Sequence, residues 1–330
     1  MKHLDAAATR AALPWGPLMQ ALLGMFELAR QGLATAPPRS HIELPGGGTL
    51  LLMPATSPDF TALKAVTVHV ANAAQGQWPV VQGDVMLMDT RTGARRLMLD
   101  GTQLTARRTA ALSVAGLTRL GRTLSRSMLL VGTGVQAQAN AQAFISLWGI
   151  QQLWISGRTL LAARVLADKL RQEFGSAAPQ IHCLSSAAEI AHIAAHETDL
   201  IVSATSSSLP VLPAQVRPDA SVVALGAYRA DMAEAPPELV RQCTVAVDAL
   251  SGARTEAGDL IQAHVDWSQV MELAHAPAQG CPAGRPVLLK TVGHALWDLA
   301  AAELAWRLLD DADRTSPAIT TNDTVLTAGL

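Results

Sequence analysis

The sequence predicts an α/β protein in two parts: a smaller α+β part, then a parallel sheet covered by helices on both faces. Three observations carry this prediction. Hydrophobic residues make up 49% of the 330 residues and charged residues only 16%, enough apolar surface for one large domain or two ordinary ones. Short apolar runs separated by turn residues occupy residues 41–99, which is typical of an antiparallel sheet. From residue 127 onward, near-continuous apolar runs alternate with helical patterns, which indicates buried parallel strands.

The first part begins with a helix, because Leu18, Leu22 and Met25 recur at helical spacing before Pro37-Pro38 ends the segment. Turn residues such as Thr92-Gly93 then separate short apolar runs. We expect these runs to be strands at 41–44, 49–53, 63–70, 80–88 and 94–99. A helix rich in Ala and Leu is expected over 104–120.

The second part alternates strands with helices. We expect strands at 128–131, 152–156, 181–184, 200–204, 221–225 and 244–247. We expect helices between them at 136–148, 160–174 and 187–195. A last helix, at 294–309, follows the sheet, and we expect it to return to the first part.

Composition excludes several classes of protein. Lys plus Arg is 25 and Asp plus Glu is 27, so the formal charge is −2, which argues against nucleic acid as a partner. The three cysteines are widely spaced and form no C-x-x-C pair, so neither a disulfide framework nor a zinc site is predicted. No other metal site is expected, because His192 and His196 are four residues apart without an evident third ligand. Residues 1–10 contain no apolar signal core, and we expect a cytoplasmic protein.

One uncharged stretch, residues 127–157, is long enough for a membrane span. It also contains several Gln residues, Asn140 and glycines that include Gly132, Gly134 and Gly149, and amides are costly in lipid without partners. We therefore interpret it as a strand, a turn and a helix in a protein core, and we expect no membrane partner.

The strongest local motif lies inside that stretch. The run Met128–Val131 leads into Gly132-Thr133-Gly134, and a helix follows. In Rossmann-type sheets the first glycine permits a tight turn and the second lets the backbone approach a pyrophosphate, while the helix N-terminus supplies free N–H groups. Ala137 replaces the third glycine and is still small enough for close packing. The alternative is an ordinary glycine-rich turn, but the strand–turn–helix context favours a dinucleotide site.

The end of the next strand bears on the choice of dinucleotide. An Asp or Glu there would bind the ribose 2′-hydroxyl of NAD. The sequence instead reads Ser156-Gly157-Arg158-Thr159. Arg158 can pair with a 2′-phosphate, and Ser156 and Thr159 can donate hydrogen bonds to it, so we expect NADPH, with NADH less favoured. The alternative is that Arg158 is an ordinary surface arginine.

Three cations in the first part form a third candidate feature. Lys64 lies within an apolar strand, Arg108 lies on the helix that leads to the dinucleotide part, and Arg39 follows Pro37-Pro38. If they converge, they can hold a small carboxylate. The sequence alone leaves solvated surface charges as the alternative. His69 follows Lys64 closely and either lines the entrance of such a pocket or has no role in it.

The chain resembles the ornithine cyclodeaminase and mu-crystallin family. The matching segments are Asp100–Ala111 (D-G-T-Q-L-T-A-R-R-T-A-A), Val131–Ala137, Ser203–Val211 and, more weakly, Glu256–Asp259 and Lys290–Asp298. The resemblance extends from about Pro38 to Ala302. It implies a homodimer in which residues 1–120 with 294–330 form a substrate-binding and dimerisation domain. Residues 121–293 would form the dinucleotide-binding Rossmann domain.

The resemblance also assigns roles to residues. Arg39, Lys64 and Arg108 correspond to a substrate-carboxylate cluster, with Lys64 and Arg108 as the candidate catalytic residues. The expected cofactor contacts are Gly132, Thr133, Gly134, Val135, Gln136, Ser156, Arg158, Thr159, Thr205 and Gly226.

One departure separates the branches of the family. Cyclodeaminases carry an acid–base Asp in a triplet that here reads Gly226-Ala227-Tyr228. A tyrosine hydroxyl is a far weaker acid than a carboxyl group and cannot replace a carboxylate base near neutral pH. The segment is instead similar to the branch that reduces cyclic ketimines. We expect reduction of Δ1-pyrroline-2-carboxylate and Δ1-piperideine-2-carboxylate by hydride transfer to the C=N carbon, without a carboxylate base opposite the cations. The alternatives are a cyclodeaminase-type lyase with bound NAD and an NADPH-containing protein that binds a thyroid-hormone-like ligand without turnover.

Overall fold

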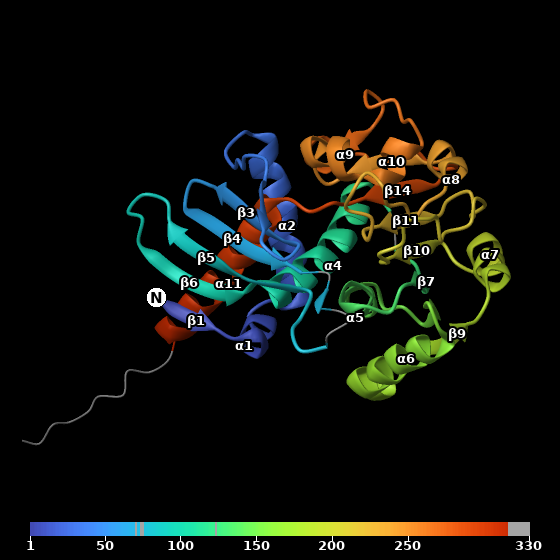
Figure 1. Cartoon of the computed structure of the whole chain (residues 1–330), viewed down its shortest axis with the longest axis horizontal. Coiled ribbons are helices and arrows are strands. Elements are labelled where there is room, and N and C mark those ends of the chain that lie inside the picture. The colour runs from blue at the N-terminus through green and yellow to red at the C-terminus, as the bar shows by residue number, and fades with distance from the viewer. Residues whose placement is uncertain (70, 73–75, 123, 316–330) are drawn as a thin grey trace, which may run out of the picture.

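The computed structural model describes residues 1–69, 71–72, 76–122 and 124–315, and its two β-sheets form separate lobes (Figure 1). The first sheet has six strands in the order β1-β6-β5-β4-β3-β2. These are β1 (Lys2–Leu4), β2 (Ser40–Leu44), β3 (Gly48–Thr56), β4 (Phe60–Val68), β5 (Val81–Asp89) and β6 (Arg95–Asp100). The five predicted strands are confirmed as β2 to β6, with shifted ends; residue 70 of the predicted 63–70 strand lies outside the described residues.

The edge of this sheet differs from the prediction. Strands β2 to β6 pair antiparallel, as expected, but β1 pairs parallel with β6. The three residues of β1 are too few to show an alternating pattern, so no local pattern indicated this strand.

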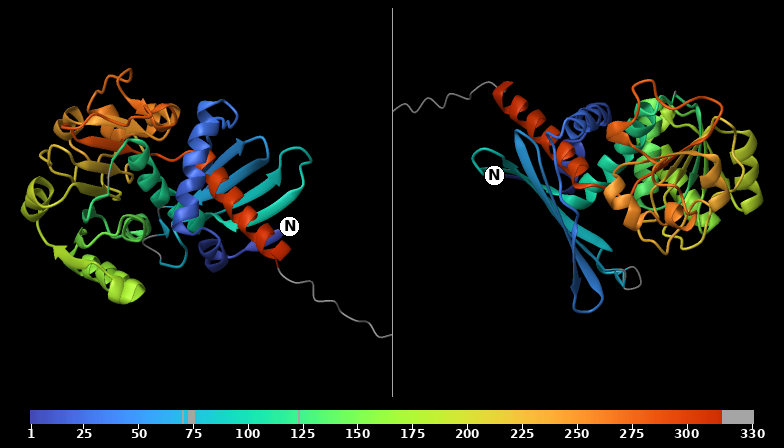
Figure 2. Two further views of the ribbon diagram at one scale, coloured as in Figure 1. Left: turned by 180° about the vertical axis from the view of Figure 1, so that it is seen from behind. Right: turned by 90° about the horizontal axis from the view of Figure 1, so that it is seen from above.

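Helices cover one face of the first sheet and leave the other uncovered (Figure 2). These are α1 (Ala6–Ala11), α2 (Trp15–Arg30), α4 (Gly101–Arg119) and α11 (Ala295–Thr315). Along β4, buried residues such as Ala62 and Lys64 alternate with half-buried ones such as Leu63 and Ala65. Lys64 therefore points toward the helices rather than toward the uncovered face.

The second sheet has eight parallel strands in the order β13-β12-β14-β11-β10-β7-β8-β9. These are β7 (Ser127–Val131), β8 (Gln152–Ser156), β9 (Gln180–Leu184), β10 (Leu200–Ser203), β11 (Ser221–Ala224), β12 (Thr244–Val247), β13 (Met271–Glu272) and β14 (Val287–Lys290). The helices that accompany them are α5 (Val135–Trp148), α6 (Leu160–Phe174), α7 (Ala187–His196), α8 (Pro237–Gln242), α9 (Leu250–Glu256) and α10 (Gly258–Gln262). The predicted parallel sheet is confirmed.

Two strands of this sheet were not predicted. The more important is β14, which lies between β11 and β12 in the interior of the sheet. Its four residues follow a loop rich in Gly and Pro rather than a helix, so the strand–helix alternation used for the prediction does not reach it.

The stretch without charges, residues 127–157, folds as β7, α5 and β8, as predicted. Among the described residues, no helix combines the length and the apolar character needed to cross a bilayer.

Two elements connect the lobes. Helix α4 packs against the second sheet so closely that a Cβ on Gly116 would lie 2.7 Å from Leu289 Cδ2 in β14. The chain then leaves β14, makes a short turn at residues 291–294 and enters α11, which returns to the first sheet as expected (Figure 2). We propose that residues 1–120 with 294–330 form one domain and that residues 121–293 form the other. Residues 316–330 lie outside the described part.

Candidate active site

The predicted glycine turn follows β7. Gly132 has φ +122°, and a Cβ there would lie 2.4 Å from the carbonyl oxygen of Ala204, so both conformation and space require glycine. Its N–H donates to Ser156 O at 2.8 Å, which joins the turn to the end of β8. Gly134 is the N-cap of α5, and no side chain caps this helix. A Cβ on Gly134 would meet nothing within 4 Å, so the space in front of the helix N-terminus is open.

A cavity of about 830 Å³ lies beside this turn. Seven of the predicted cofactor residues line it, namely Gly132, Thr133, Gly134, Ser156, Arg158, Thr159 and Thr205. Three predicted contacts do not: Val135 is 61% exposed, Gln136 is half-buried on the first turn of α5, and Gly226 follows β11. The open space at Gly134, the uncapped N-terminus of α5 and the cavity together fit the pyrophosphate of a dinucleotide.

The residues predicted to bind a 2′-phosphate line the same cavity. Ser156 ends β8, Arg158 is exposed, and Thr159 caps α6 by accepting the Ala162 N–H at 3.2 Å. Within the described residues, the Arg158 guanidinium makes no recorded ion pair. The arrangement leaves it available to an anionic ligand.

Two of the three predicted substrate-binding cations meet in the first lobe. Lys64 Nζ lies 2.7 Å from Asp298 Oδ2, and Arg108 Nε lies 2.8 Å from Asp298 Oδ1. The three side chains come from β4, α4 and α11 and are at most 5% exposed. Arg108 uses only Nε in this contact, and its terminal nitrogens face Gly293, where a Cβ would lie 3.2 Å from one of them.

Arg39 lies on the other side of the same turn. Its guanidinium donates to Val292 O at 3.0 Å and to Gly293 O at 2.8 Å, and it pairs with Glu256 Oε2 at 3.0 Å. Because Arg108 also faces Gly293, the three cations converge around the 291–294 turn. This outcome favours a common site over solvated surface charges.

Two carboxylates accompany the cations, and the sequence interpretation missed both. Instead of a site without a carboxylate, the structure places Asp298 between Lys64 and Arg108 and Glu256 against Arg39. Asp298 had one available signal, since it is an acid within the apolar segment Ala295–Ala302. A third carboxylate, the buried Asp248, binds the 291–294 turn that these cations surround, so three carboxylates lie near the three cations.

Burial and neighbouring charges shift the pKa values of this cluster. Burial lowers the pKa of Lys64 to about 8, with Arg108 and Arg39 acting in the same direction and Asp298 opposing them. Burial alone would raise the pKa of Asp298, but Arg108 and Lys64 together hold it below its usual range. Burial raises the pKa of Glu256, although Arg39 and His41 oppose this shift. Asp298 therefore stays ionised, whereas Lys64 is poised to lose its proton near neutral pH.

A smaller cavity of about 240 Å³ adjoins the cluster at the junction of the lobes. Its lining includes Arg39, His41, Met53, Glu256, Gly293 and His294. Lys64 and Arg108 lie behind this lining rather than in it. Burial lowers the pKa of His294 from its usual value, so this side chain is mainly neutral at neutral pH.

The turn that separates Arg108 from this cavity is held from both sides. The buried Asp248 accepts the N–H groups of Val292 at 3.2 Å and Gly293 at 2.8 Å, while Arg39 binds the carbonyl groups of the same residues. Gly293 has φ +86°. His69 lies away from this region: it packs on Gly48 at the start of β3 and does not line the cavity.

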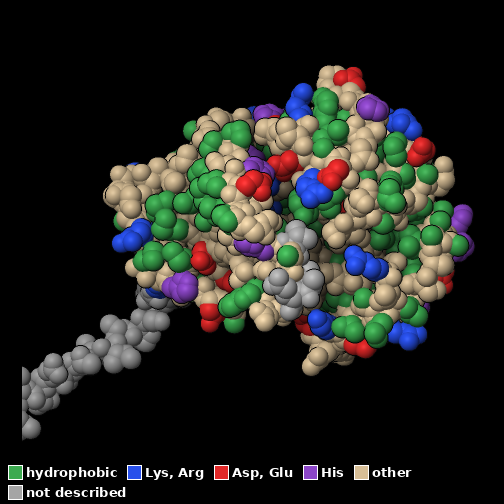
Figure 3. All heavy atoms as spheres, in the orientation of Figure 1, with side chains coloured by type: hydrophobic (Ala, Val, Ile, Leu, Met, Phe, Trp, Pro, Cys, Tyr) green, Lys and Arg blue, Asp and Glu red, His purple; other side chains and the backbone are tan. Residues whose placement is uncertain are grey.

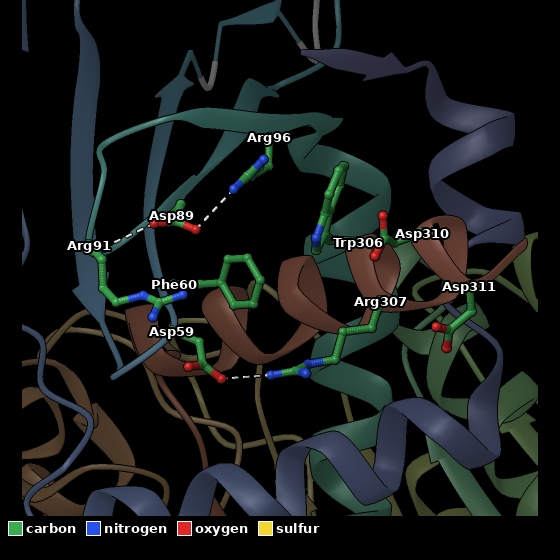
Figure 4. A pocket seen from close by; sticks show the side chains of 9 residues that line it. All are labelled: Asp59, Phe60, Asp89, Arg91, Arg96, Trp306, Arg307, Asp310 and Asp311. Carbon is green, nitrogen blue, oxygen red and sulfur yellow. Dashed lines mark hydrogen bonds and ion pairs between the residues drawn. The ribbon is translucent and has the colours of Figure 1, made fainter. Parts of the chain in front are cut away.

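Another cavity, of about 430 Å³, lies at the other end of α11 (Figure 4). Arg307 pairs there with Asp59 at 3.0 Å, and Arg96 pairs with Asp89 at 3.0 Å. None of the predicted site residues lines it, and we assign it no part in the reaction.

Comparison with known proteins identifies what the chain resembles. The family model described as ornithine cyclodeaminase/mu-crystallin family matches residues 6–310. The chain is 37% identical over 306 residues to Delta(1)-pyrroline-2-carboxylate reductase 2 of Burkholderia ambifaria, covering 93% of this chain and 95% of the relative. It is 36% identical to the Delta(1)-pyrroline-2-carboxylate/Delta(1)-piperideine-2-carboxylate reductase of Azospirillum brasilense, with 91% and 94% covered.

Among solved structures, the Delta(1)-pyrroline-2-carboxylate reductase of Thermococcus litoralis, in complex with NADH and L-proline, has a TM-score of 0.86. It is 26% identical and covers 95% of this chain and 98% of its own.

Proposed function

The chain belongs to the ornithine cyclodeaminase/mu-crystallin family, and from that premise we propose that it reduces cyclic ketimines. The products are proline from Δ1-pyrroline-2-carboxylate and pipecolate from Δ1-piperideine-2-carboxylate. The protein is an oxidoreductase that acts on cyclic imino acids with a nicotinamide cofactor, as the relatives at 36–38% identity are named for this reaction. Within the chain itself, the observation that carries the proposal is the cluster that Arg39, Lys64 and Arg108 form around the 291–294 turn.

The cluster is suited to an anionic ring. Arg108 binds Asp298 through Nε, which leaves its two terminal nitrogens to bind a substrate carboxylate as a bidentate pair. Asp298 already holds Lys64 and Arg108, so the substrate carboxylate would share these cations with it. Binding in one orientation presents one face of the C=N bond, and such orientation supplies much of the acceleration in a reaction of this type.

Reduction adds a hydride to the imine carbon and a proton to the imine nitrogen. The dinucleotide, when bound, supplies the hydride. Lys64 is the group that can supply the proton, because its pKa of about 8 keeps it mostly protonated at neutral pH yet able to release the proton. Asp298 stabilises the protonated form of Lys64 before transfer and remains ionised throughout.

The preferred dinucleotide in this proposal is NADPH. Arg158 supplies a positive charge beside the cavity, and Ser156 and Thr159 supply hydroxyl groups. No Asp or Glu follows β8 to bind a free 2′-hydroxyl.

The proposal also includes a homodimer formed through the uncovered face of the first sheet. Strand register places Leu63, Met86 and Met98 side by side on that face, on β4, β5 and β6, and Leu52 of β3 lies on the same face opposite Ala65. Hydrophobic side chains gather over this lobe in the space-filling view (Figure 3). An apolar sheet face of this kind is normally covered by a partner, and a second copy presents the same surface.

One assay separates the proposed reaction from its alternatives. The purified protein is mixed with NADPH or NADH and each cyclic imine, and the nicotinamide absorbance is followed. We expect oxidation of the dinucleotide only when imine is present, and faster with NADPH. Ammonia release from ornithine without net cofactor oxidation would instead support a lyase, and the absence of any turnover would support a binding protein.

A further inference from the structure

Glu234 is a buried carboxylate that the reaction described above does not use. It lies between β11 and α8 and is 0% exposed. Its Oε1 accepts hydrogen bonds from Ser203 Oγ at 2.7 Å, Thr205 N at 2.6 Å and Thr205 Oγ1 at 3.0 Å. Its Oε2 accepts from the N–H groups of Gly226 at 2.6 Å and Ala227 at 3.4 Å. Backbone N–H groups can only donate, and each oxygen of the carboxylate accepts at least one of them.

These partners belong to two different strand ends. Ser203 and Thr205 lie at the end of β10, and Gly226 and Ala227 follow β11. The two ends touch, because a Cβ on Gly226 would lie 1.9 Å from Thr205 O. Glu234 therefore fixes these two strand ends relative to one another.

The main chain of Glu234 holds the loop that leaves β10. Its carbonyl oxygen accepts the N–H groups of Val211 and Leu212, both at 2.9 Å. The loop is thus bound at its start by the carboxylate, at Thr205, and at its end by this carbonyl. Thr205, Ser206, Ser207 and Val211 all line the dinucleotide cavity.

Glu234 is itself held by a second buried layer. Asp259 Oδ1 accepts the N–H groups of Glu234 at 2.5 Å and Ala235 at 2.8 Å. Asp259 Oδ2 pairs at 2.8 Å with Lys290, which ends β14, and both side chains are 0% exposed. Three neighbouring strands, β10, β11 and β14, are therefore tied together at their carboxyl ends, where open α/β sheets bind their ligands.

We propose that Glu234 is a positioning residue for hydride transfer. Through its five side-chain hydrogen bonds it holds the β10 loop, which lines the dinucleotide cavity, against the Gly226 turn, and this loop would position the bound dinucleotide for the reaction. This inference rests on the proposed function, since it concerns the geometry of the dinucleotide in that reaction.

The expected loss of rate in a Glu234 variant follows from the sensitivity of hydride transfer to distance. Glu234→Gln keeps the side-chain volume but turns an NH₂ group toward N–H donors, so one strand end must move away. A displacement of about 1 Å can cost roughly a hundredfold in rate. Binding of the imine depends on Arg39, Lys64 and Arg108, which Glu234 does not contact, so its KM should change little.

The test compares the wild-type protein with Glu234→Gln and with the control Glu238→Gln. Glu238 lies four residues away, its side chain is 60% exposed, and its carboxylate lies 3.5 Å from Arg241. The readouts are kcat, KM for imine and dinucleotide, thermal unfolding, and the primary isotope effect with NADPH deuterated at the transferring C4 position.

For Glu234→Gln we expect kcat to fall by about tenfold or more, the isotope effect to rise and the imine KM to stay within about twofold. The control should match the wild type. Loss of folding stability alone would lower the active fraction without raising the isotope effect. A folded Glu234→Gln variant with wild-type kcat and isotope effect would overturn the proposal.

If Glu234→Gln does not fold, Ser203→Ala decides the matter, because it removes one hydrogen bond to Oε1 and leaves the backbone bonds in place. We then expect a smaller fall in kcat with a raised isotope effect, and unchanged values of both would overturn the proposal. A wild-type protein that oxidises no dinucleotide with any cyclic imine would instead contradict the proposed function, so the two failures are distinguishable.

Discussion

Lys64 differs from a surface lysine in its titration. Burial lowers its pKa to about 8, while the neighbouring Asp298 keeps it from falling further. If Lys64 gives its proton to the imine nitrogen, kcat needs the protonated form and declines as the pH rises past about 8. Lys64→Arg should lower kcat and remove this decline from the residual activity, since a guanidinium stays protonated throughout that range and does not release its proton. The measurement is the pH profile of kcat for both proteins.

The substrate imine also titrates, so the wild-type profile alone is ambiguous. A decline that comes from the imine would persist in Lys64→Arg at the same pH. That result would remove Lys64 as the proton donor.

Arg158 gives the corresponding prediction for the cofactor. Arg158→Asp removes the proposed partner of the 2′-phosphate and adds a repelling charge, so the preference for NADPH over NADH should fall by roughly tenfold to a hundredfold. The ratio of kcat/KM for the two dinucleotides measures this change. Arg164→Asp is the control, because Arg164 is exposed on α6 and does not line the cavity. An unchanged preference in Arg158→Asp would show that the 2′-phosphate is recognised elsewhere.

At the residue scale the sequence identified the cations but not their partners. Arg108 and Asp298 are 190 positions apart, and only the return of α11 to the first sheet brings them together. The same holds for Glu256 and Glu234, whose partners lie on other elements. A single sequence does not show which distant residue a charged side chain will pair with. The glycine turn after β7 depends only on neighbouring residues, and it was predicted correctly.

At the scale of elements, the turn between β7 and α5 permits a paired test of the cofactor site. Gly132→Ala should destabilise the fold by about 2 kcal/mol or more, because φ is +122° and the new Cβ meets Ala204 O. Gly134→Ala should leave the fold nearly unchanged, because its Cβ enters open space. It should nevertheless weaken NADPH binding by roughly tenfold or more, since the pyrophosphate would occupy that space.

Thermal unfolding and NADPH titration measure the two effects separately. Gly24→Ala in α2 is the control, because its Cβ also meets nothing within 4 Å and lies in the other lobe. Wild-type NADPH affinity in Gly134→Ala would move the pyrophosphate away from this helix N-terminus.

The elements that were predicted well are those with a long or strongly alternating pattern. Helix α6 was predicted with its observed ends, because Thr159 provides a cap and Gly175 follows the last turn. Strands β1, β13 and β14 are two to four residues long and show no usable period. The pairing of β14 between β11 and β12 is set by the whole sheet, so no local pattern could have revealed it.

For the whole molecule, the uncovered face of the first sheet predicts a dimer. Leu63→Lys places a charge at the centre of that face and should convert the protein to a monomer, because an unpaired charge cannot be buried against a second apolar face. Light scattering after size-exclusion chromatography measures the mass in solution. Leu161→Lys is the control, since Leu161 is 71% exposed on the other lobe. A wild-type protein that is already monomeric would exclude this interface.

The arrangement of the two lobes explains why the reaction was harder to predict than the fold. Most strands of each sheet follow from patterns within their own segment, but the cation cluster needs β4, α4 and α11 together with the turn from the second sheet. The resemblance to a family supplied that juxtaposition in advance of the structure.

The proposed reduction of cyclic ketimines depends most on a cation cluster that binds the carboxylate of the imine. The most direct test measures kcat/KM of wild type and Arg108→Met with Δ1-pyrroline-2-carboxylate and with the same ring lacking the carboxylate. We predict a loss of about a hundredfold for the carboxylated imine, mainly in KM, and little change for the other. Equal losses for both imines, or none for either, would contradict the assignment of Arg108 to the substrate carboxylate.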